Sequence, residues 1–484
     1  MLPPRSRPRP GVRAGTALLL AGLLLAGAAA APVAAAGTPG EPGTAGIGDP
    51  YFPQDGNGGI DVLHYAVHDA YDLDERRLRG HTVLTLRATE DLASLHLDLL
   101  LPVTSVRVDG RRAAYDRPNR HELRITPRDP LAAGETVRVR VAYDGWPGTI
   151  RWRGDAPWLA DDHEVVTMGE PHMAAWWFPA NDHPRDKASF DVSVTVPRDL
   201  QVVANGVRVS RRVHGPRATT HWRSVEPMAP YLAFFAAGRF AVRHGSDGGL
   251  PWTVAVSKAV PSPTRQRSMR LMLRTPGVVA WLEGELGDYP FAVTGGLTTS
   301  LAPGFALENQ TRPTYPVLAA GSVGTVVHEL AHQWFGDSVS VRDWRDVWLN
   351  EGAATFMEAR WDETHGGRSA EQWLEQTYDG IDAHDDFWRI RVADPGPGRL
   401  FAWPVYVRGG MALEALRRRI DDEPTFWLLL RTWLADHRGG NGSTADFEAL
   451  AEQVTGLDLD GFFRAWLHAT SRPARTAANG LSGG

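Results

Sequence analysis

Two histidines separated by three residues are the first side chains in this sequence whose spacing could do chemistry. His328 and His332 begin and end the segment His-Glu-Leu-Ala-His. On a helix, residues four positions apart lie on one face about one turn, roughly 6 Å, apart, so both imidazoles can reach one metal ion. Glu329 lies beside that face, where its carboxylate can take a proton from a water molecule that the ion activates. The spacing therefore predicts a metal site with a general base next to it.

A third ligand is needed, because catalytic zinc sites generally combine three protein ligands with one open position for water. Glu351 supplies it, since eighteen residues separate it from His332 and it lies in a second segment with helical spacing. Histidine and carboxylate ligands suit zinc, although other divalent ions could support activity. We therefore expect one Zn²⁺ ion per chain, bound by His328, His332 and Glu351. The alternative, a pair of structural histidines on a buried helix, is disfavoured by the glutamate at this spacing.

These ligands must be positioned by a mainly α-helical second half, because the apolar residues after about Leu250 follow helical spacing. We expect helices at residues 264–285, 321–336, 348–364, 371–384, 409–421, 424–437 and 458–469. One β-like segment, roughly residues 296–309, comes just before the helix with the two histidines.

The first half has the pattern of half-buried β-strands, in which apolar and polar residues alternate. Examples are residues 81–87, 105–108, 136–141 and 191–196. Turn signals separate such runs at Asp109-Gly110, Asp144-Gly145 and Asn205-Gly206. The sequence therefore predicts an α+β multidomain protein, with an antiparallel all-β domain followed by a mainly α domain.

Composition excludes several other classes of protein. Hydrophobic residues make up 43% and charged residues 22% of the 484 residues, which is typical of globular domains with conventional cores. The formal net charge of -6 provides no basic surface for nucleic acid, so we expect no nucleic-acid partner. The absence of cysteine rules out disulfides and leaves histidine and carboxylates as metal ligands.

The amino end has the pattern of an export signal. An apolar run at residues 17–31 is followed by small residues up to Ala36. Four arginines precede this run, namely Arg5, Arg7, Arg9 and Arg13. We expect cleavage after Ala36 and a secreted, extracellular protein. The alternative is a membrane anchor, but the leucine-rich part is short and diluted by Ala and Gly. No later segment has the composition to span a bilayer.

These patterns predict five parts of the chain. They are a signal peptide at residues 1–36, a flexible leader at 37–49, a β domain at 50–245, a mainly α domain with the metal ligands at 246–472 and a loose tail at 473–484.

Several longer motifs resemble those of the aminopeptidase-N-like family of zinc metallopeptidases, gluzincins that include the leukotriene hydrolases. The similarity covers the metal segment Val327–Asp337, then Asp343-Trp344 and Val347–Gly352. It continues in Gly287–Phe291 and in Trp177–Pro179 with the nearby Asp182, Pro184 and Lys187. The resemblance implies a saddle-like β domain and a thermolysin-like catalytic domain, here in a short two-domain secreted form.

The resemblance also implies residues that bind the substrate. Glu308, in a segment similar to the family's Gly-Ala-Met-Glu-Asn, and Glu170 would hold the free amino group of a peptide. A carboxylate beside an ammonium gains a charge-assisted bond that an internal amide cannot offer. Asn309 would shape the strand that pairs with the substrate backbone. Phe305 and Leu307 differ from the family's usual residues, which leaves the preferred amino-terminal residue open.

Tyr406 is similar to the family's tyrosine that donates a hydrogen bond to the tetrahedral intermediate. It lies in Tyr-Val-Arg-Gly before a predicted helix, with Arg408 where the family commonly has lysine. The segment Phe462–Leu467 resembles the end of the family's catalytic domain. In longer relatives a further helical domain follows it and walls the cleft. The resemblance therefore implies a more open cleft here, which would accept longer peptides.

Together these features predict a zinc-dependent aminopeptidase that acts on peptides with a free amino terminus. Three alternatives stay open: a zinc endopeptidase, a zinc hydrolase of another bond such as an epoxide, and an exported binding module without catalysis. The last would have no use for Glu329, which is not a ligand. The oligomeric state and the physiological substrate are not predicted by the sequence.

Overall fold

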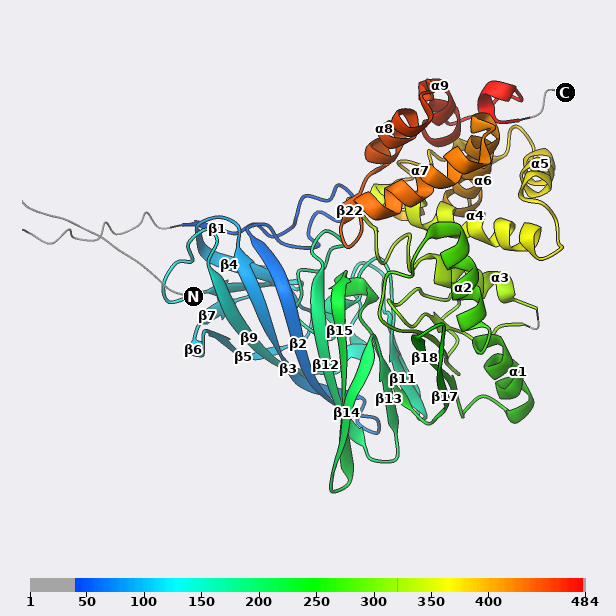
Figure 1. The fold of residues 1–484 in the computed structure, drawn as a ribbon. Coiled ribbons are helices and arrows are strands. Elements are labelled where there is room, and N and C mark those ends of the chain that lie inside the picture. Colours follow the sequence, from blue (N-terminus) through cyan, green and yellow to red (C-terminus); the bar gives the residue numbers. More distant parts are fainter. Residues whose placement is uncertain (1–39, 320, 482–484) are drawn as a thin grey trace, which may run out of the picture. The chain divides into compact units, whose positions relative to one another are not determined.

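The computed structural model describes residues 40–319 and 321–481, in which a β-rich region precedes a mainly helical one (Figure 1). The predicted signal peptide, residues 1–36, lies outside the described residues, as do residues 37–39 of the predicted leader. The predicted order, an antiparallel β domain followed by a mainly α domain, is confirmed. Within the described residues, no helix combines the length and the apolar character needed to cross a membrane.

The largest sheet has eight strands. Neighbouring strands in it run antiparallel, except β12 and β2, which run parallel. In spatial order the strands are β14 (Val207–His214), β15 (Arg217–Met228), β12 (Ala188–Pro197), β2 (Ile60–Asp72), β3 (Arg77–Ala88), β9 (Thr136–Gly145), β5 (Val103–Val108) and β6 (Arg111–Arg112). All four alternating segments named above lie in this sheet, on β3, β5, β9 and β12. Along β12 every second residue is buried, which is the period-two pattern that predicted a half-buried strand.

Two smaller sheets complete the β region. One consists of β1 (Glu41–Pro42), β4 (Leu92–Asp98), β8 (Glu122–Thr126) and β7 (Ala114–Asp116). The other consists of β10 (Trp158–Ala160), β11 (Glu164–Thr167), β16 (Phe235–Gly238) and β13 (Gln201–Ala204).

Two of the three predicted turns are confirmed. Asp109 and Gly110, which both have positive φ, join β5 to β6. Asn205 and Gly206 join β13 to β14, and a Cβ added at Gly206 would lie 2.0 Å from the carbonyl oxygen of Arg223, so only glycine fits. Asp144-Gly145 was wrong as a turn, because both residues continue β9 and pair with β3.

The second half contains a mixed sheet and the helices. The sheet has the order β17 (Phe240–Asp247), β18 (Leu250–Ser257), β19 (Thr294–Thr298) and β20 (Thr314–Tyr315), and β21 (Ser340–Val341) pairs separately with β22 (Asn441–Gly442). The predicted strand at residues 296–309 is only partly correct, because β19 ends at Thr298 and only Leu307 forms a further bridge, to Thr314. The predicted domain boundary at 245–246 falls within β17 and stays a prediction.

The described helices are α1 (Ser262–Met272), α2 (Thr275–Leu286), α3 (Val323–Ala331), α4 (Trp348–Thr364), α5 (Ala370–Gly380), α6 (Trp403–Ile420), α7 (Glu423–Asp436), α8 (Thr444–Thr455) and α9 (Asp460–Phe463). The predicted helix 264–285 is two helices, because Pro276 in the first turn of α2 cannot continue a preceding helix. The helix predicted at 409–421 begins earlier, at Trp403, and α8 was not predicted. The helix predicted at 458–469 is the short α9 followed by a π-helical turn, Arg464–His468.

The leader prediction was wrong for residues 40–49, which have fixed contacts. Strand β1 pairs in parallel with β4, and the Gly43 amide donates to the carbonyl of Ser94 at 2.8 Å. Asp49 is 1% exposed and accepts hydrogen bonds from the amides of Tyr51 and Trp344. Backbone hydrogen bonds and one buried acid hold this segment, and neither produces an apolar period in the sequence.

The tail prediction was also wrong, for residues 473–481. The Tyr378 hydroxyl donates to the carbonyl of Pro473 at 2.6 Å, and the Trp466 indole donates to the carbonyl of Asn479 at 3.1 Å. Leu481 is 1% exposed, so its apolar side chain belongs to the core.

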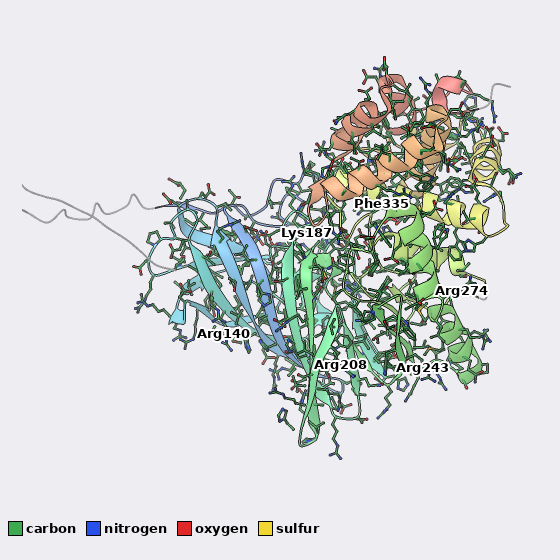
Figure 2. The ribbon with its side chains drawn as sticks, in the orientation of Figure 1. Arg140, Lys187, Arg208, Arg243, Arg274 and Phe335 are labelled. Carbon is green, nitrogen blue, oxygen red and sulfur yellow. The ribbon has the colours of Figure 1, made fainter. Side chains whose placement is uncertain are left out.

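A half-buried lysine joins the β region to the helical region. Lys187 directly precedes β12, at the end of that strand nearest to the helices (Figure 2). Its ammonium donates to the carbonyls of Asp337 at 2.8 Å, Ser338 at 2.9 Å and Gly440 at 3.1 Å. Asp337 and Ser338 follow the helix that carries His328, and Gly440 directly precedes β22.

Candidate metal centre and active site

Helix α3 has one apolar face that packs into the core. Val326, Val327 and Leu330 are fully buried on it. His328 lies within the helix and His332 directly follows its last residue, so the predicted helical spacing of four is present. The core contacts of the apolar residues thus fix the direction in which both imidazoles point.

The two imidazoles and Glu351 converge. His328 Nε2 lies 3.2 Å and His332 Nε2 lies 3.4 Å from the same carboxylate oxygen, Glu351 Oε2. One ligand atom from each residue falls within 4.8 Å of the other two. Glu351 is in the first turn of α4, so neighbouring helices bring the three side chains together as the sequence predicted.

The second nitrogen of each imidazole has its own partner. His328 Nδ1 lies 2.8 Å from Glu358 Oε1, and His332 Nδ1 lies 3.0 Å from the carbonyl oxygen of Phe335. Both partners are acceptors, so each Nδ1 carries a proton and each Nε2 faces Glu351. With Nδ1 held in this way, a neutral imidazole presents its Nε2 lone pair to a metal ion.

The cluster attracts positive charge. Burial lowers the pKa of His332, but the carboxylate of Glu351 outweighs it and raises this pKa to about 9. Burial raises the pKa of Glu351, but the two imidazoles outweigh it and lower this pKa to about 2. Two imidazoles and a carboxylate, with matching tautomers and spacing, therefore fit a zinc ion.

A cavity of about 340 Å³ opens onto these ligands. Every residue predicted for metal binding, catalysis or amine binding lines this cavity, whereas Asn309 does not. The apolar part of the lining consists of Phe305, Ala306, Leu307 and Phe401. Glu329 and Tyr406 thus share one space with the metal ligands. A cavity of this size can hold the first residue of a peptide.

Glu308 and Glu170 provide the acidic end of this cavity. Glu308 is 3% exposed and accepts a hydrogen bond from the Tyr231 hydroxyl at 3.1 Å. Glu170 Oε1 is buried and has no hydrogen-bond partner among the described residues. Burial raises the pKa of Glu170 well above its ordinary value, and the negative charges of Glu308 and Glu351 raise it further. Two carboxylates that line one cavity are suited to bind a cation.

Asn309 does not line the cavity but helps to fix the backbone next to Glu308. It is fully buried, and its side-chain amide donates to the carbonyl of Leu232 at 3.1 Å. Gln333, from the turn after α3, donates to the carbonyl of Glu308 itself at 2.9 Å. These bonds fix the backbone at Glu308, which is not part of a strand.

Burial shifts the pKa values of both Glu329 and Tyr406 upward. Burial raises the pKa of Glu329 to about 8, against the two imidazoles, which lower it. Burial and the nearby carboxylates raise the pKa of Tyr406 well above its ordinary value, so its hydroxyl keeps its proton. The ring of Tyr406 lies parallel to that of His328, with 6.0 Å between the ring centres. Tyr406 lies inside α6 rather than before a helix.

The distance between α4 and α6 is set by glycines. A Cβ added at Gly352 would lie 2.9 Å from the Cα of Gly409, which leaves no room for a side chain on either helix. Gly352 follows the ligand Glu351, and Gly409 lies one turn after Tyr406. The close contact therefore holds Tyr406 near the metal ligands.

Three site residues were missed in the sequence. Glu358 lies seven residues, or two helical turns, after Glu351, a spacing that places both carboxylates on one face of α4. Tyr231 lies in a three-residue 3₁₀ helix, Pro230–Leu232, and Phe401 lies in the turn before α6. Neither segment is long enough to show periodicity.

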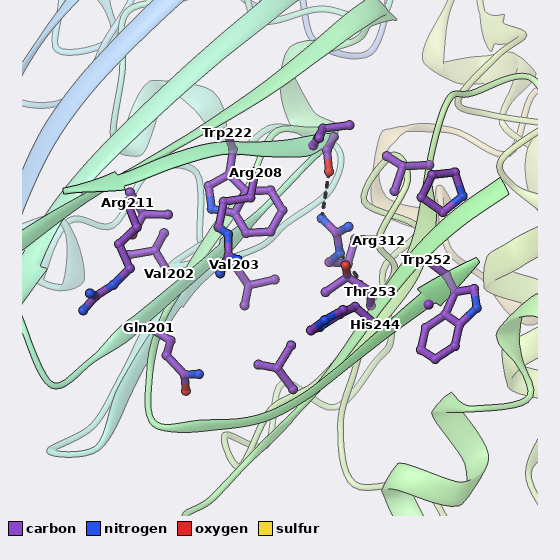
Figure 3. A pocket seen from close by; sticks show the side chains of 17 residues that line it. Gln201, Val202, Val203, Arg208, Arg211, Trp222, His244, Trp252, Thr253 and Arg312 are labelled. Atoms are coloured by element: carbon purple, nitrogen blue, oxygen red, sulfur yellow. Dashed lines mark hydrogen bonds between the residues drawn. The ribbon is translucent and has the colours of Figure 1, made fainter. Parts of the chain in front are cut away.

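Another cavity, of about 350 Å³, contains none of the predicted site residues (Figure 3). Arg312 lines it, fully buried, and donates to the carbonyls of Gly206 and Thr253 at 3.3 Å each. The guanidinium lies 4.9 Å from the ring centre of Trp222. These contacts join the eight-stranded sheet to β18.

Comparison with known proteins gives consistent matches. Residues 312–466 match the Peptidase family M1 domain, and residues 62–232 match the Peptidase M1 N-terminal domain. Among curated proteins, "Glutamyl aminopeptidase" of Rattus norvegicus is 28% identical over 338 residues, which cover 62% of this chain and 35% of the relative. "Aminopeptidase N" of Lactococcus lactis subsp. cremoris (strain MG1363) is 25% identical over 454 residues, which cover 86% of this chain and 51% of the relative. The chain thus spans about half or less of these relatives' length.

Solved structures match over nearly their whole length. A mutant M1 zinc metallopeptidase from Deinococcus radiodurans, bound to a Tyr-Ser-Ala substrate, is 28% identical with a TM-score of 0.79, covering 89% of this chain and 99% of that one. A mutant two domain M1 zinc metallopeptidase bound to L-arginine is 28% identical with a TM-score of 0.77, covering 89% of this chain and 100% of that one.

Proposed function

Because the chain belongs to the aminopeptidase-N-like M1 family of zinc metallopeptidases, we propose that it is a zinc-dependent aminopeptidase. Its substrates are peptides with a free amino terminus, and it hydrolyses their first peptide bond. One zinc ion occupies the site of His328, His332 and Glu351.

The observation that supports this proposal best is the position of Glu308 and Glu170. Both carboxylates line the same cavity as the metal ligands, and Glu170 Oε1 has no partner among the described residues. A substrate ammonium there gains charge-assisted hydrogen bonds, while the blocked end of a peptide would leave the acids unpaired. The acids thus limit cleavage to one residue from the amino end.

When bound, zinc supplies a Lewis acid that polarises the scissile carbonyl and lowers the pKa of the attacking water. Glu329 takes a proton from that water and passes it to the leaving nitrogen. Glu329 lines the same cavity as the metal ligands without being one of them, so its carboxylate is free to accept and return a proton. The Tyr406 hydroxyl, which keeps its proton, donates a hydrogen bond to the developing oxyanion.

The test is the hydrolysis of Tyr-Ser-Ala, the peptide bound by the Deinococcus radiodurans relative, with and without an acetylated amino end. We expect the free peptide to be cleaved after Tyr, a chelator to abolish the activity, and added zinc to restore it. Glu308→Gln should lower kcat/KM for the free peptide by about 10- to 100-fold, because it removes one charge-assisted bond. Glu75→Gln, at an exposed acid in the turn between β2 and β3, is the matched control and should have no effect.

Two outcomes would contradict the proposal. Equal cleavage of the acetylated peptide, insensitive to Glu308→Gln, would identify an endopeptidase. A zinc-loaded, folded protein that hydrolyses neither peptides nor aminoacyl-arylamides would be a binding module.

We also propose that the chain is exported. The support is the sequence alone, in which arginines, an apolar run at residues 17–31 and small residues up to Ala36 follow the order of a secretory signal. The absence of cysteine means that folding after export needs no disulfide. Amino-terminal sequencing of protein from the culture medium should begin just after Ala36, and protein found only in the cell with Met1 retained would contradict export.

A further inference from the structure

A second cluster of metal-binding side chains lies within the β region. Asp98 is the last residue of β4 and Glu122 is the first residue of β8, and the two are partners in the antiparallel register. His121 directly precedes Glu122. All three residues are at most 1% exposed, and none of them lines the cavity of the candidate active site.

The spacing of this cluster matches that of the candidate active site. His121 Nδ1 lies 3.5 Å from Asp98 Oδ1 and 3.3 Å from Glu122 Oε1. The corresponding distances from His328 and His332 to Glu351 are 3.2 and 3.4 Å. Ligand atoms bound tetrahedrally to one zinc ion are about 3.3–3.5 Å apart. Both clusters therefore have the dimensions of a zinc ligand set.

Two carboxylate oxygens of these residues are buried and lack hydrogen bonds within the described part of the chain, and one of them, Asp98 Oδ1, faces His121. Asp98 Oδ2 accepts from the amides of Gly56 at 3.0 Å and Asp182 at 2.7 Å, which fixes the carboxylate. Its other oxygen, Oδ1, has no hydrogen-bond partner among the described residues. The same is true of Glu122 Oε2, which lies 3.4 Å from His96 Nδ1. Buried carboxylate oxygens without donors cost free energy unless a cation binds them.

Further acids lie near Asp98. Asp55 and Asp182 are each 1% exposed and close enough to Asp98 to repel its charge. His172 contacts Asp55 at 2.7 Å and Arg153 lies 3.8 Å from it, so cationic groups pair with Asp55. Asp182 forms no ion pair within the described residues, and a divalent cation would neutralise the negative charge that the cluster and Asp182 share.

We propose that Asp98, His121 and Glu122 bind a second divalent ion of the zinc class, with a structural role. One imidazole nitrogen and two carboxylate oxygens suit such an ion better than calcium, which takes six to eight oxygens. His96 is placed to provide a fourth ligand or to hold Glu122. The ion would tie the ends of β4 and β8 to the segments of Gly56 and Asp182. The proposal does not depend on the proposed enzymatic function.

The test is the number of zinc ions per chain in the full-length protein. The protein is stripped with a chelator, reloaded with zinc and dialysed, and zinc is measured by elemental mass spectrometry. We expect about two ions in the wild type and one in His332→Ala, which lacks an active-site ligand. The double variant His121→Ala/Glu122→Gln should also retain one ion and should still hydrolyse aminoacyl-arylamides.

Asp69→Asn is the matched control and should retain two ions. Asp69, on β2, is 3% exposed and has one oxygen, Oδ2, without a partner among the described residues, but it belongs to neither metal-binding group. If the double variant does not fold, the number of zinc sites is measured by titrating the stripped wild type with zinc against a competing chelator. We expect this titration to find two sites per chain.

A single ion in the wild type that is lost in His332→Ala would overturn the proposal, and so would two ions in the folded double variant. Loss of peptidase activity in every protein would count against the enzymatic function and leave the ion count unaffected.

Discussion

Glu358 orients one of the predicted metal ligands without belonging to them. Its carboxylate contacts His328 Nδ1 at 2.8 Å, so the other nitrogen of the imidazole presents its lone pair to the site. A carboxylate on the far side of a ligating histidine also makes the imidazole more basic. The ligand set on its own would leave the tautomer of His328 undetermined.

Glu358→Gln should therefore weaken zinc binding. The amide keeps an acceptor but loses the negative charge, and such changes typically cost about 10- to 100-fold in metal affinity or activity. The affinity is measured by competition with a zinc chelator. Glu448→Gln is the matched control, since Glu448 forms a similar contact with His468, at 2.7 Å, at an exposed position. Unchanged zinc affinity in Glu358→Gln would show that this carboxylate does not orient the ligand.

At the residue scale, the sequence predicted the side chains whose chemistry follows from local spacing. His328, His332 and Glu351 converge because two of them share a helix face and the third begins a neighbouring helix. Glu358 has an equally regular spacing from Glu351, but its role depends on which helix packs opposite. Tyr231, which donates to Glu308, comes from a short 3₁₀ helix 77 residues earlier, and no local pattern connects residues so distant in the chain.

Helices α4 and α6 approach so closely that their backbones touch. Gly352 and Gly409 face each other at the contact, and the atoms nearest to an added Cβ belong to the backbone, which cannot move aside. Since α4 carries Glu351 and α6 carries Tyr406, the same contact sets the distance between a metal ligand and the proposed oxyanion donor.

Gly352→Ala should separate the two helices. We expect the free energy of unfolding to fall by about 1–3 kcal/mol, as for other overpacked cores, and kcat to fall more than KM rises. Denaturant unfolding and steady-state kinetics measure the two effects. Gly284→Ala, in α2, has open space around an added Cβ and should be neutral or stabilising by up to about 1 kcal/mol. Kinetics and stability like those of the wild type in Gly352→Ala would contradict this role of the contact.

At the element scale, long periodic segments were predicted well and their ends poorly. Helix α4 matches its predicted bounds, 348–364, because buried residues recur along it. Helix α8 was missed, although Ser443 and Asp446 form a capping box whose spacing is visible in the sequence. The segment around Glu308 was expected to be a strand, but the backbone there is fixed by side-chain amides of Asn309 and Gln333, which no alternation predicts.

Lys187 connects the two regions of the chain through three carbonyls. Lys187→Met keeps the length of the side chain but leaves these acceptors unpaired and removes the positive charge near Asp337. We expect the free energy of unfolding to fall by about 2–4 kcal/mol. Lys258→Met, at an exposed lysine, should change it by less than about 0.5 kcal/mol. Equal effects of the two substitutions in urea denaturation would contradict the role of Lys187.

The same lysine predicts a dependence on pH. Burial lowers the pKa of Lys187 from 10.5 to about 7, against Asp337, which raises it. Between these values the unfolded chain binds one proton more than the folded chain, so the free energy of unfolding rises with pH. The difference in stability between the wild type and Lys187→Met should therefore widen from pH 7 to about 9. A constant or narrowing difference in urea denaturation would contradict this.

Asp49 has a practical consequence for where the mature chain can begin. Its carboxylate accepts from the amide of Trp344, just ahead of the helix that carries Glu351, and it also contacts His183 at 3.2 Å. Trimming by proteases, or a purification tag, at any position up to residue 39 leaves this anchor in place. A recombinant chain that starts at Tyr51 would lack it, so over-digestion at the amino end should inactivate the protein although the cut lies nearly 300 residues before the metal ligands.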